Sequence, residues 1–168
     1  SVKAVKILSK SERLFEQMGW ANIRERISLY NNLGLGYWKL GNTAKATEYY
    51  RKGEELITLN PGYSQQSAML LRNYGRLLLS QSNLEDAEEK FRESIEINQK
   101  VKVGISTTEL GMSDFYSPSI AIQCIEGIAD VYSQKYRVSQ TDQLAQKTFD
   151  YYAKAVELID NFRLTVVD

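Results

Sequence analysis

The feature that most constrains this chain is an internal repeat with a period of 41 residues. Large apolar residues match in size at this offset, since Phe91 replaces Tyr50 and Leu78 replaces Tyr37. A fixed period of this length indicates a repeat architecture, because one unit cannot bury its own apolar stripe and neighbouring units must stack. The residues that recur unchanged 41 positions later include the pairs Asn32 and Asn73, Gly34 and Gly75, Asn42 and Asn83, Ala46 and Ala87, Glu48 and Glu89, Arg51 and Arg92, and Glu55 and Glu96.

Each unit has the apolar spacing of two amphipathic helices, with large residues three and four positions apart. In the first unit, Gly41 separates the helices, and Asn42 or Thr43 caps the second one, which Pro61-Gly62 ends. In the second unit, Asn83 and Asp86 form the expected cap pair. The first-helix stripes are Ile27, Tyr30, Leu33, Tyr37 and Leu40, then Leu70, Leu71, Tyr74, Leu77 and Leu78. The second-helix stripes are Ala46, Tyr50, Gly53, Leu56 and Ile57, then Ala87, Phe91, Ser94, Ile95 and Ile97.

A third unit follows an insertion at residues 103–116, and it begins at Ser117-Pro118, since proline is typical of the first helical position. Its spacing predicts a longer hairpin near residues 137–143. Its stripes are Ile122, Ile125, Ile128, Ala129 and Tyr132, then Thr148, Tyr152, Ala155, Val156 and Ile159. We therefore expect one array over residues 1–168: a flanking helix or half repeat at 1–26, repeats at 27–62, 66–101 and 118–160, an inserted loop at 102–117 and a tail at 161–168.

Charge and residue types exclude several classes of function. The chain has 21 Lys and Arg and 21 Asp and Glu, so its net charge is 0, unlike the basic excess of nucleic-acid-binding proteins. Histidine is absent and Cys124 is the only cysteine, which removes imidazole bases and ligands and a cysteine-based zinc cage. We expect Cys124 to be a small buried residue, and the acidic run at residues 85–89 to be a solvated face.

Membrane and export signals are also missing from the sequence. No run of about 18 apolar residues is present, so we expect no membrane-spanning helix. One unpaired cysteine and the lack of an export signal favour an intracellular, cytoplasmic setting. Together with the missing chemistry, this predicts no catalytic site, no cofactor, no metal site, and no nucleic-acid or membrane partner.

The segment from Leu33-Gly34 through Tyr37, Gly41, Ala46 and Tyr50 resembles the tetratricopeptide repeat. The second unit keeps Gly75, Ala87 and Phe91, and the third keeps Ala129, Tyr132, Tyr152 and Ala155. The resemblance implies an all-α fold, a right-handed superhelix of stacked helical hairpins, in which Gly34, Gly75 and Ala129 let helices approach closely. The usual period is about 34 residues, so the longer period here requires longer helices or loops. It is similar to the extended repeats of kinesin light chains and LGN-type adaptors.

The same resemblance implies that a peptide or a partner helix lies along a concave face made by the first helices. Asparagine side chains there bind a peptide backbone or tie neighbouring helices together. Arg72 and Arg76, one turn apart, grip a carboxylate or phosphate, or else pair with Glu126 and Asp130 of the next unit. Trp38 is an aromatic anchor or part of the core. The inward positions are Asn31, Asn32, Leu35, Trp38, Met69, Arg72, Asn73, Arg76, Leu79, Gln123, Glu126 and Asp130.

Co-chaperone arrays grip a C-terminal carboxylate with a Lys/Asn/Asn/Lys/Arg set. The matching positions here are Asn31, Leu35, Asn73, Gln123 and Gly127, and Asn73 alone agrees, which argues against that activity. We expect a non-catalytic protein–protein interaction module that belongs to a larger scaffold or adaptor. Two alternatives are a regulatory or sensor domain of a multidomain enzyme or transcription regulator, and self-association through the open ends of the array.

Overall fold

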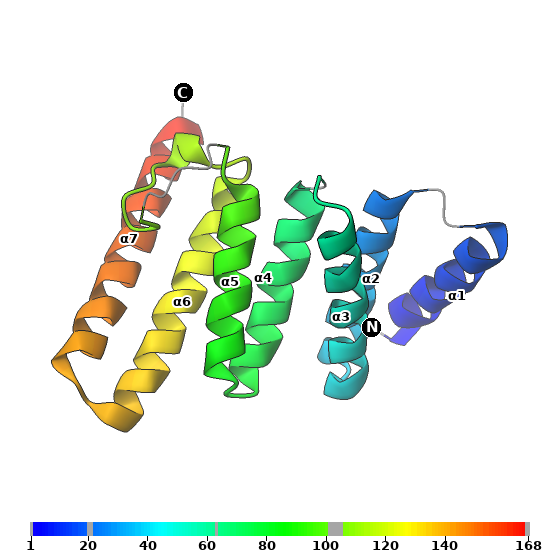
Figure 1. Cartoon of the computed structure of the whole chain (residues 1–168), viewed down its shortest axis with the longest axis horizontal. Helices are drawn as coiled ribbons and strands as arrows, with labels where there is room; N and C mark the ends of the chain where they lie inside the picture. Colours follow the sequence, from blue (N-terminus) through cyan, green and yellow to red (C-terminus); the bar gives the residue numbers. More distant parts are fainter. Residues whose placement is uncertain (1, 20–21, 63, 101–105, 167–168) are drawn as a thin grey trace.

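A computed structural model describes residues 2–19, 22–62, 64–100 and 106–166, which form a row of α-helices joined in hairpins (Figure 1). No strand is assigned within these ranges, apart from an isolated bridge between Gln99 and Phe115. The predicted all-α fold of stacked helical hairpins is therefore confirmed. None of the described helices is both long and apolar enough to span a lipid bilayer. The helices are α1 (Val2–Met18), α2 (Ile23–Lys39), α3 (Thr43–Leu59), α4 (Ser64–Ser80), α5 (Leu84–Asn98), the short 3-10 helix η1 (Met112–Asp114), α6 (Pro118–Ser139) and α7 (Asp142–Val166).

The period of 41 residues comes from long helices. Helices α2 and α4 begin 41 residues apart, and so do α3 and α5. Helices α2, α3 and α4 each have 17 residues, and α5 has 15. The connections between them are short, so the extra length beyond the usual repeat adds about one turn to each helix.

Local chemistry fixes the turns between these helices. Gly41 has a φ of 76°, in the left-handed region that glycine adopts without a steric penalty. Asn42 caps α3 as predicted, because its Oδ1 accepts a hydrogen bond from the Lys45 backbone N at 3.1 Å. Asn83 occupies the same position before α5, but its Nδ2 instead donates to Asp86 Oδ2 at 2.7 Å.

Glycines allow the units to approach closely around two buried aromatic rings. A Cβ atom on Gly34 would lie 2.7 Å from the Tyr50 ring, and one on Gly75 would lie 2.9 Å from the Phe91 ring. A third close contact joins two units, since a Cβ on Gly127 of α6 would lie 2.5 Å from Phe91 of α5, and Ala129 on the same helix is fully buried. Phe91 is therefore held between α4 and α6, and it leaves no room for side chains at these positions.

The third unit differs from the prediction in the length of its helices. Helix α6 continues to Ser139 and α7 begins at Asp142, so the extra residues lengthen both helices and leave a short turn, not a long hairpin loop. Residues 161–166 continue α7 and form no separate tail, and residues 167–168 lie outside the described ranges. In the predicted stripe of α7, Ala155 is buried, whereas Tyr152 and Val156 are exposed.

Helix α1 has the position of the second helix of a repeat, which is the half repeat that the sequence predicted as one possibility. Glu12 of α1 accepts a hydrogen bond from Tyr49 Oη of α3 at 2.8 Å. Glu54 of α3 makes the corresponding contact with Lys90 Nζ of α5 at 2.6 Å, and Tyr49 and Lys90 are 41 residues apart. Helices α1, α3 and α5 therefore follow one another with the same spacing along the sequence, since each begins 41 residues after the one before it.

The insertion between α5 and α6 is closed by the buried side chain of Asn98. Its Nδ2 donates to the Ser117 carbonyl oxygen at 2.7 Å, and its Oδ1 accepts from the Ser117 backbone N at 2.9 Å. Phe115 is buried in the core next to this contact. Of the predicted inserted loop at 102–117, residues 102–105 lie outside the described ranges, and the rest includes η1.

Candidate partner-binding surface

A line of hydrogen bonds crosses the first helices of the three units. Asn73 Nδ2 of α4 donates to Asn31 Oδ1 of α2 at 2.8 Å, and both side chains are buried. Arg72 Nη2 donates to Asn73 Oδ1 at 2.8 Å, and Arg72 Nη1 donates to Gln123 Oε1 of α6. Asn31 and Asn73 thus tie neighbouring helices together. We call the side of these helices that carries Arg72 and Gln123 the α2–α4–α6 face.

Trp38 and Arg76 form a second link on this face. The Arg76 guanidinium carbon lies 5.9 Å from the centroid of the Trp38 ring, within the range of a cation–π contact. Trp38 is half-buried and packs against the core, and Arg76 is exposed. The ring therefore anchors the arginine and keeps its charged end at the surface.

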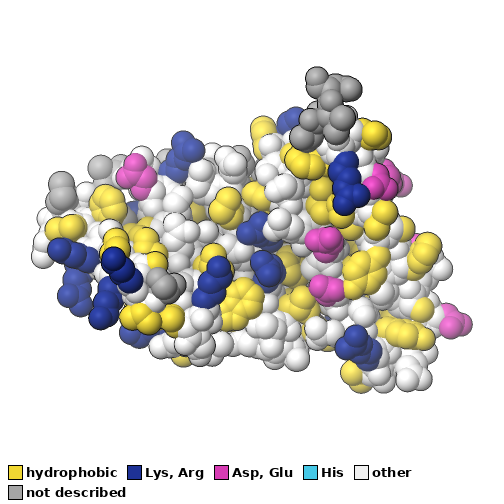
Figure 2. All heavy atoms as spheres, turned by 180° about the vertical axis from the view of Figure 1, so that it is seen from behind, with side chains coloured by type: hydrophobic (Ala, Val, Ile, Leu, Met, Phe, Trp, Pro, Cys, Tyr) yellow, Lys and Arg dark blue, Asp and Glu magenta, His cyan; other side chains and the backbone are white. Residues whose placement is uncertain are grey.

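The remaining predicted residues differ in exposure. In Figure 1, α3 and α5 lie in front of α2, α4 and α6, and Figure 2 shows the molecule from behind. Lys and Arg side chains gather there over the α1 end, and Asp and Glu side chains lie mostly over the α6 and α7 end (Figure 2). Among these remaining inward positions, four side chains are exposed and three are half-buried. The exposed ones are Asn32, Met69, Gln123 and Asp130, and the half-buried ones are Leu35, Leu79 and Glu126.

The predicted ion pairs between these arginines and α6 do not form. Arg72 binds Gln123 instead, and Arg76 lies over Trp38. Asp130 accepts a hydrogen bond from Tyr152 Oη of α7 at 2.5 Å. Within the described ranges, neither arginine has a carboxylate partner, so the alternative that paired them with Glu126 and Asp130 is wrong.

The electrostatics of the face follow from this lack of carboxylates. Burial lowers the pKa of Arg72, and the neighbouring charge of Arg76 lowers it further. Burial raises the pKa of Tyr50, while the positive charges of Arg72 and Arg76 oppose the rise, which places all three groups close together. Arginine stays charged at any ordinary pH. The centre of the α2–α4–α6 face is therefore positive and not neutralised.

Cys124 lies beneath this face and is chemically inert. Its Sγ is within 3.2 Å of Ser94 Oγ, to which it donates, and burial raises the pKa of the thiol to about 12. The protonated thiol is a poor nucleophile, and the prediction of a small buried residue is confirmed. In the described part of the chain, no group of His, Cys, Asp and Glu is arranged to hold a metal ion.

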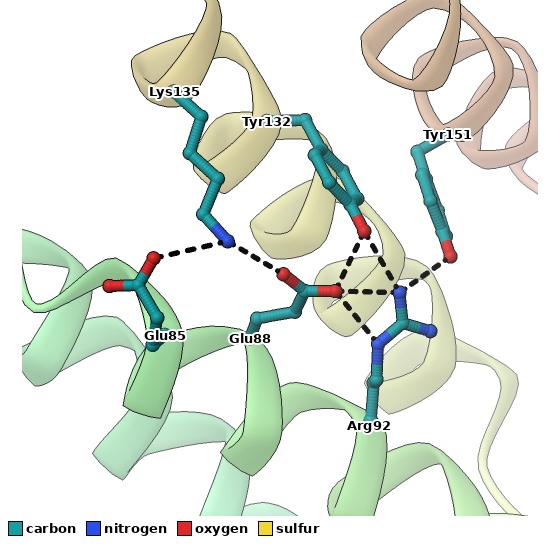
Figure 3. A network of polar contacts seen from close by, with 6 residues as sticks. All are labelled: Glu85, Glu88, Arg92, Tyr132, Lys135 and Tyr151. Atoms are coloured by element: carbon teal, nitrogen blue, oxygen red, sulfur yellow. Dashed lines mark hydrogen bonds and ion pairs between the residues drawn. The ribbon is translucent and has the colours of Figure 1, made fainter. Parts of the chain in front are cut away.

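The structure also shows a polar network at the junction of α5, α6 and α7 (Figure 3). Glu88 Oε1 accepts from Arg92 Nη2 at 2.7 Å and from Tyr132 Oη at 2.8 Å, and Glu88 Oε2 accepts from Lys135 Nζ at 3.0 Å. Arg92 Nη2 also donates to Tyr151 Oη of α7 at 3.0 Å. The network joins the second and third units, although the sequence predicted that Glu88 belongs to a solvated face.

A sequence signal for this network existed in the spacing of its members. Glu88 and Arg92 are four residues apart, and Tyr132 and Lys135 are three apart, so each pair lies on one helical face. What the sequence could not show is that these two faces meet, because the insertion breaks the repeat period between α5 and α6. Glu85, by contrast, is exposed as predicted.

Replacing Glu88 by Gln is expected to lower the free energy of unfolding by about 2 kcal/mol at neutral pH. Burial opposes the charge of Glu88, but hydrogen bonds from Arg92, Tyr132 and Lys135 outweigh it and lower its pKa. A lowered pKa gives stability above the unfolded value, near pH 4.3, which is lost as the pH falls through the folded value. Urea unfolding at several pH values should therefore show a gap between wild type and variant that closes below about pH 4.

The exposed Glu85 provides the control for this measurement. It lies within 3.5 Å of Lys135 Nζ but is mostly solvated, so Glu85→Gln should change the stability by less than about 0.5 kcal/mol. Equal effects of the two substitutions would contradict the assignment of the network to Glu88.

Comparison with known proteins agrees with this geometry. Residues 25–100, which cover α3, α4 and α5 and most of α2, match the family model described as tetratricopeptide repeat. The match supports a tetratricopeptide repeat domain in this part of the chain, and such repeats generally mediate protein–protein interaction. Neither the curated proteins nor the solved structures gave a significant match.

Proposed function

Because the fold and the family match support a tetratricopeptide repeat domain over residues 25–100, we propose that this chain is a non-catalytic module that binds an acidic peptide on its α2–α4–α6 face. The observation that carries the proposal is the pair Arg72 and Arg76, which have no carboxylate partner among the described residues. An acidic side chain of the peptide would neutralise them by charge-assisted hydrogen bonds.

The neighbouring side chains suit the rest of such a peptide. Trp38, under Arg76, offers an aromatic surface to an apolar peptide side chain. Asn32 and Gln123 are exposed amides that can donate to and accept from a peptide backbone. Asn31 and Asn73 are buried in the line of hydrogen bonds, so their proposed part is to fix the position of Arg72.

The proposal includes a long-period type of repeat, similar to those of kinesin light chains and LGN-type adaptors. The helices of 17 residues support this type, because they give the inner helices more length along which a ligand can lie. The proposal also places the module in a larger scaffold or adaptor protein in the cytoplasm.

An array of synthetic peptides that differ only in having Glu, Gln or Lys at the same positions tests the proposal. The wild-type chain should prefer the Glu peptides, and Arg72→Glu with Arg76→Glu should weaken their binding about 100-fold, as the loss of two charge-assisted hydrogen bonds implies. Binding is measured by fluorescence anisotropy with labelled peptides, and circular dichroism confirms that the variant is folded.

A second variant with the same change of net charge is the control. Lys45→Glu with Lys52→Glu alters α3, outside the α2–α4–α6 face, and should leave the affinity for Glu peptides within about threefold of wild type. A wild-type chain without preference for acidic peptides, or equal losses in the two variants, would show that Arg72 and Arg76 do not form the site.

A further inference from the structure

The last helix of the array carries an apolar stripe that no described element covers. Tyr132 stacks on Tyr151 with ring centroids 5.6 Å apart, as Tyr37 stacks on Tyr49 at 5.5 Å in the first unit. Tyr151 is therefore the counterpart of Tyr49, and Tyr152 is the counterpart of Tyr50. Tyr50 is fully buried and stacks on Tyr74 of the next unit, whereas Tyr152 is 39% exposed.

Two further apolar side chains extend this stripe. Phe149 is 67% exposed and Val156 is 56% exposed, and together with Tyr152 they follow the three- and four-residue spacing of one helical face. An exposed stripe of this size at the end of a stacked array is the kind of surface that a further helix covers. We call Phe149, Tyr152 and Val156 the α7 stripe.

Helix α1, at the other end of the array, has an outer side that matches the α7 stripe. Its Ile7 and Leu14 are 58% and 49% exposed, and Lys3 and Lys10 lie on the same side at helical spacing. This side faces away from Val5, which is buried against α2. The outer side of α1 is thus an amphipathic surface that combines apolar and basic side chains.

The charges at the two ends are complementary. The exposed side of α1 carries Lys3, Lys6, Lys10 and Arg13, and within the described ranges none of them pairs with a carboxylate. Exposed carboxylates at the other end include Asp160 on α7, which lies 3.9 Å from the equally exposed Arg163, and Asp130, which accepts the hydrogen bond from Tyr152. Figure 2 shows this separation, with Lys and Arg gathered at the α1 end and Asp and Glu mostly near α6 and α7.

We propose that α1 of a second copy of this chain docks on the α7 stripe, so that the copies associate head to tail. Ile7 and Leu14 of one copy cover Phe149, Tyr152 and Val156 of the other, while Lys3 and Lys10 face the carboxylates beside the stripe. The contact joins two different surfaces, so each pair of copies leaves one α1 and one α7 stripe free, and association continues into open chains or closes into a ring. The contact does not use Arg72 or Arg76.

Two variants, each with one altered end, test the proposal in the whole chain. The first carries Ile7→Glu and Lys10→Glu on α1, and the second carries Phe149→Glu and Val156→Glu on α7. These positions are exposed, so circular dichroism and the melting temperature should stay close to those of wild type. Light scattering after size exclusion, over about a hundredfold range of concentration, measures the mass of each chain and of their mixture.

The wild-type mass should rise with concentration above the 19.2 kDa of one chain, and each variant alone should stay at 19.2 kDa. The mixture should form a dimer with one copy of each variant, because the intact α1 of the second variant fits the intact stripe of the first. The altered α1 of the first variant and the altered α7 of the second variant both carry Glu, so these two ends repel each other. The double variant Arg72→Glu with Arg76→Glu should associate like wild type. A loss of association can therefore be distinguished from a loss of peptide binding.

Several outcomes would overturn the proposal. A wild-type chain of constant mass at all concentrations shows that the ends do not associate. A dimer of the α1 variant alone shows that two α7 stripes pair with each other, and a dimer of the α7 variant alone shows that two α1 helices do. A mixture that stays monomeric shows that a contact seen for wild type uses other surfaces.

Discussion

Replacing Phe91 by Ala is expected to lower the free energy of unfolding by about 4 kcal/mol, the largest stability change that we predict for one substitution. The Phe91 ring is fully buried between α4 and α6, in contact distance of Gly75 and Gly127. Removing it takes away apolar contacts of two units and leaves a cavity that stiff helix backbones cannot close. Urea unfolding followed by far-UV circular dichroism measures the loss.

Phe149 on α7 is the matched control, because the same substitution there removes a ring that is mostly in water. Phe149→Ala should change the stability of the monomer by less than about 0.5 kcal/mol. If Phe91→Ala were as mild as Phe149→Ala, the ring would not lie between the units as the structure places it.

The second large effect is expected for Gly75→Leu. A Cβ at this position would lie 2.9 Å from the Phe91 ring, so a leucine must push the ring or the helix away. Overpacking of this kind costs about 3 kcal/mol, and the better helix propensity of leucine returns about 1 kcal/mol. We therefore expect a net loss of about 2 kcal/mol, which lowers the melting temperature by about 6 °C for a chain of this length.

Gly62 distinguishes the close contact from the general effect of adding a side chain. A Cβ there would meet no other atom within 4 Å, and the residue is exposed in the turn after α3. Gly62→Leu should leave the melting temperature within about 2 °C of wild type. An unshifted melt for Gly75→Leu would contradict the close approach of α4 and α5.

The sequence predicted the first two units well because their signals agree with one another. The repeat period, the apolar stripes and the turns at Gly41 and Asn42 all indicate the same hairpin, and the structure confirms it. The all-α fold and the close approach at Gly34 and Gly75 follow from the same residues. Agreement between local propensity and packing is what makes such predictions reliable.

The third unit was harder because the insertion destroys the period there. Spacing alone cannot distinguish a longer loop from longer helices, and here α6 and α7 are longer. The close contact of Gly127 with Phe91, across the junction of α5 and α6, was also not predicted, because the broken period hides which residues of α6 face α5. Exposure of Tyr152 also could not be predicted, since it depends on what covers the end of the array.

For the candidate site, the sequence predicted which residues share the inner helices but not which of them bind one another. One of the two predicted alternatives paired Arg72 and Arg76 with carboxylates on α6, and the structure instead gives Gln123 and Trp38. Such choices depend on side-chain reach between helices, which periodicity does not contain. The binding roles on the α2–α4–α6 face therefore stay predictions that the charge-reversal experiment decides.

The two hydrogen bonds between Asn98 and the Ser117 backbone have a consequence for how this array can change over evolution. Since one buried amide binds both the backbone N and the carbonyl oxygen of Ser117, the chain leaves and rejoins the stack at two fixed points. Extra residues between these points, outside the buried Leu110 and Phe115, add only a slowly growing entropy of loop closure, about 0.6 kcal/mol for each doubling of the loop length. Outside these two core residues, the segment can thus gain, lose or exchange sequence, and so acquire new specificity, while the arrangement of the helices is inherited unchanged.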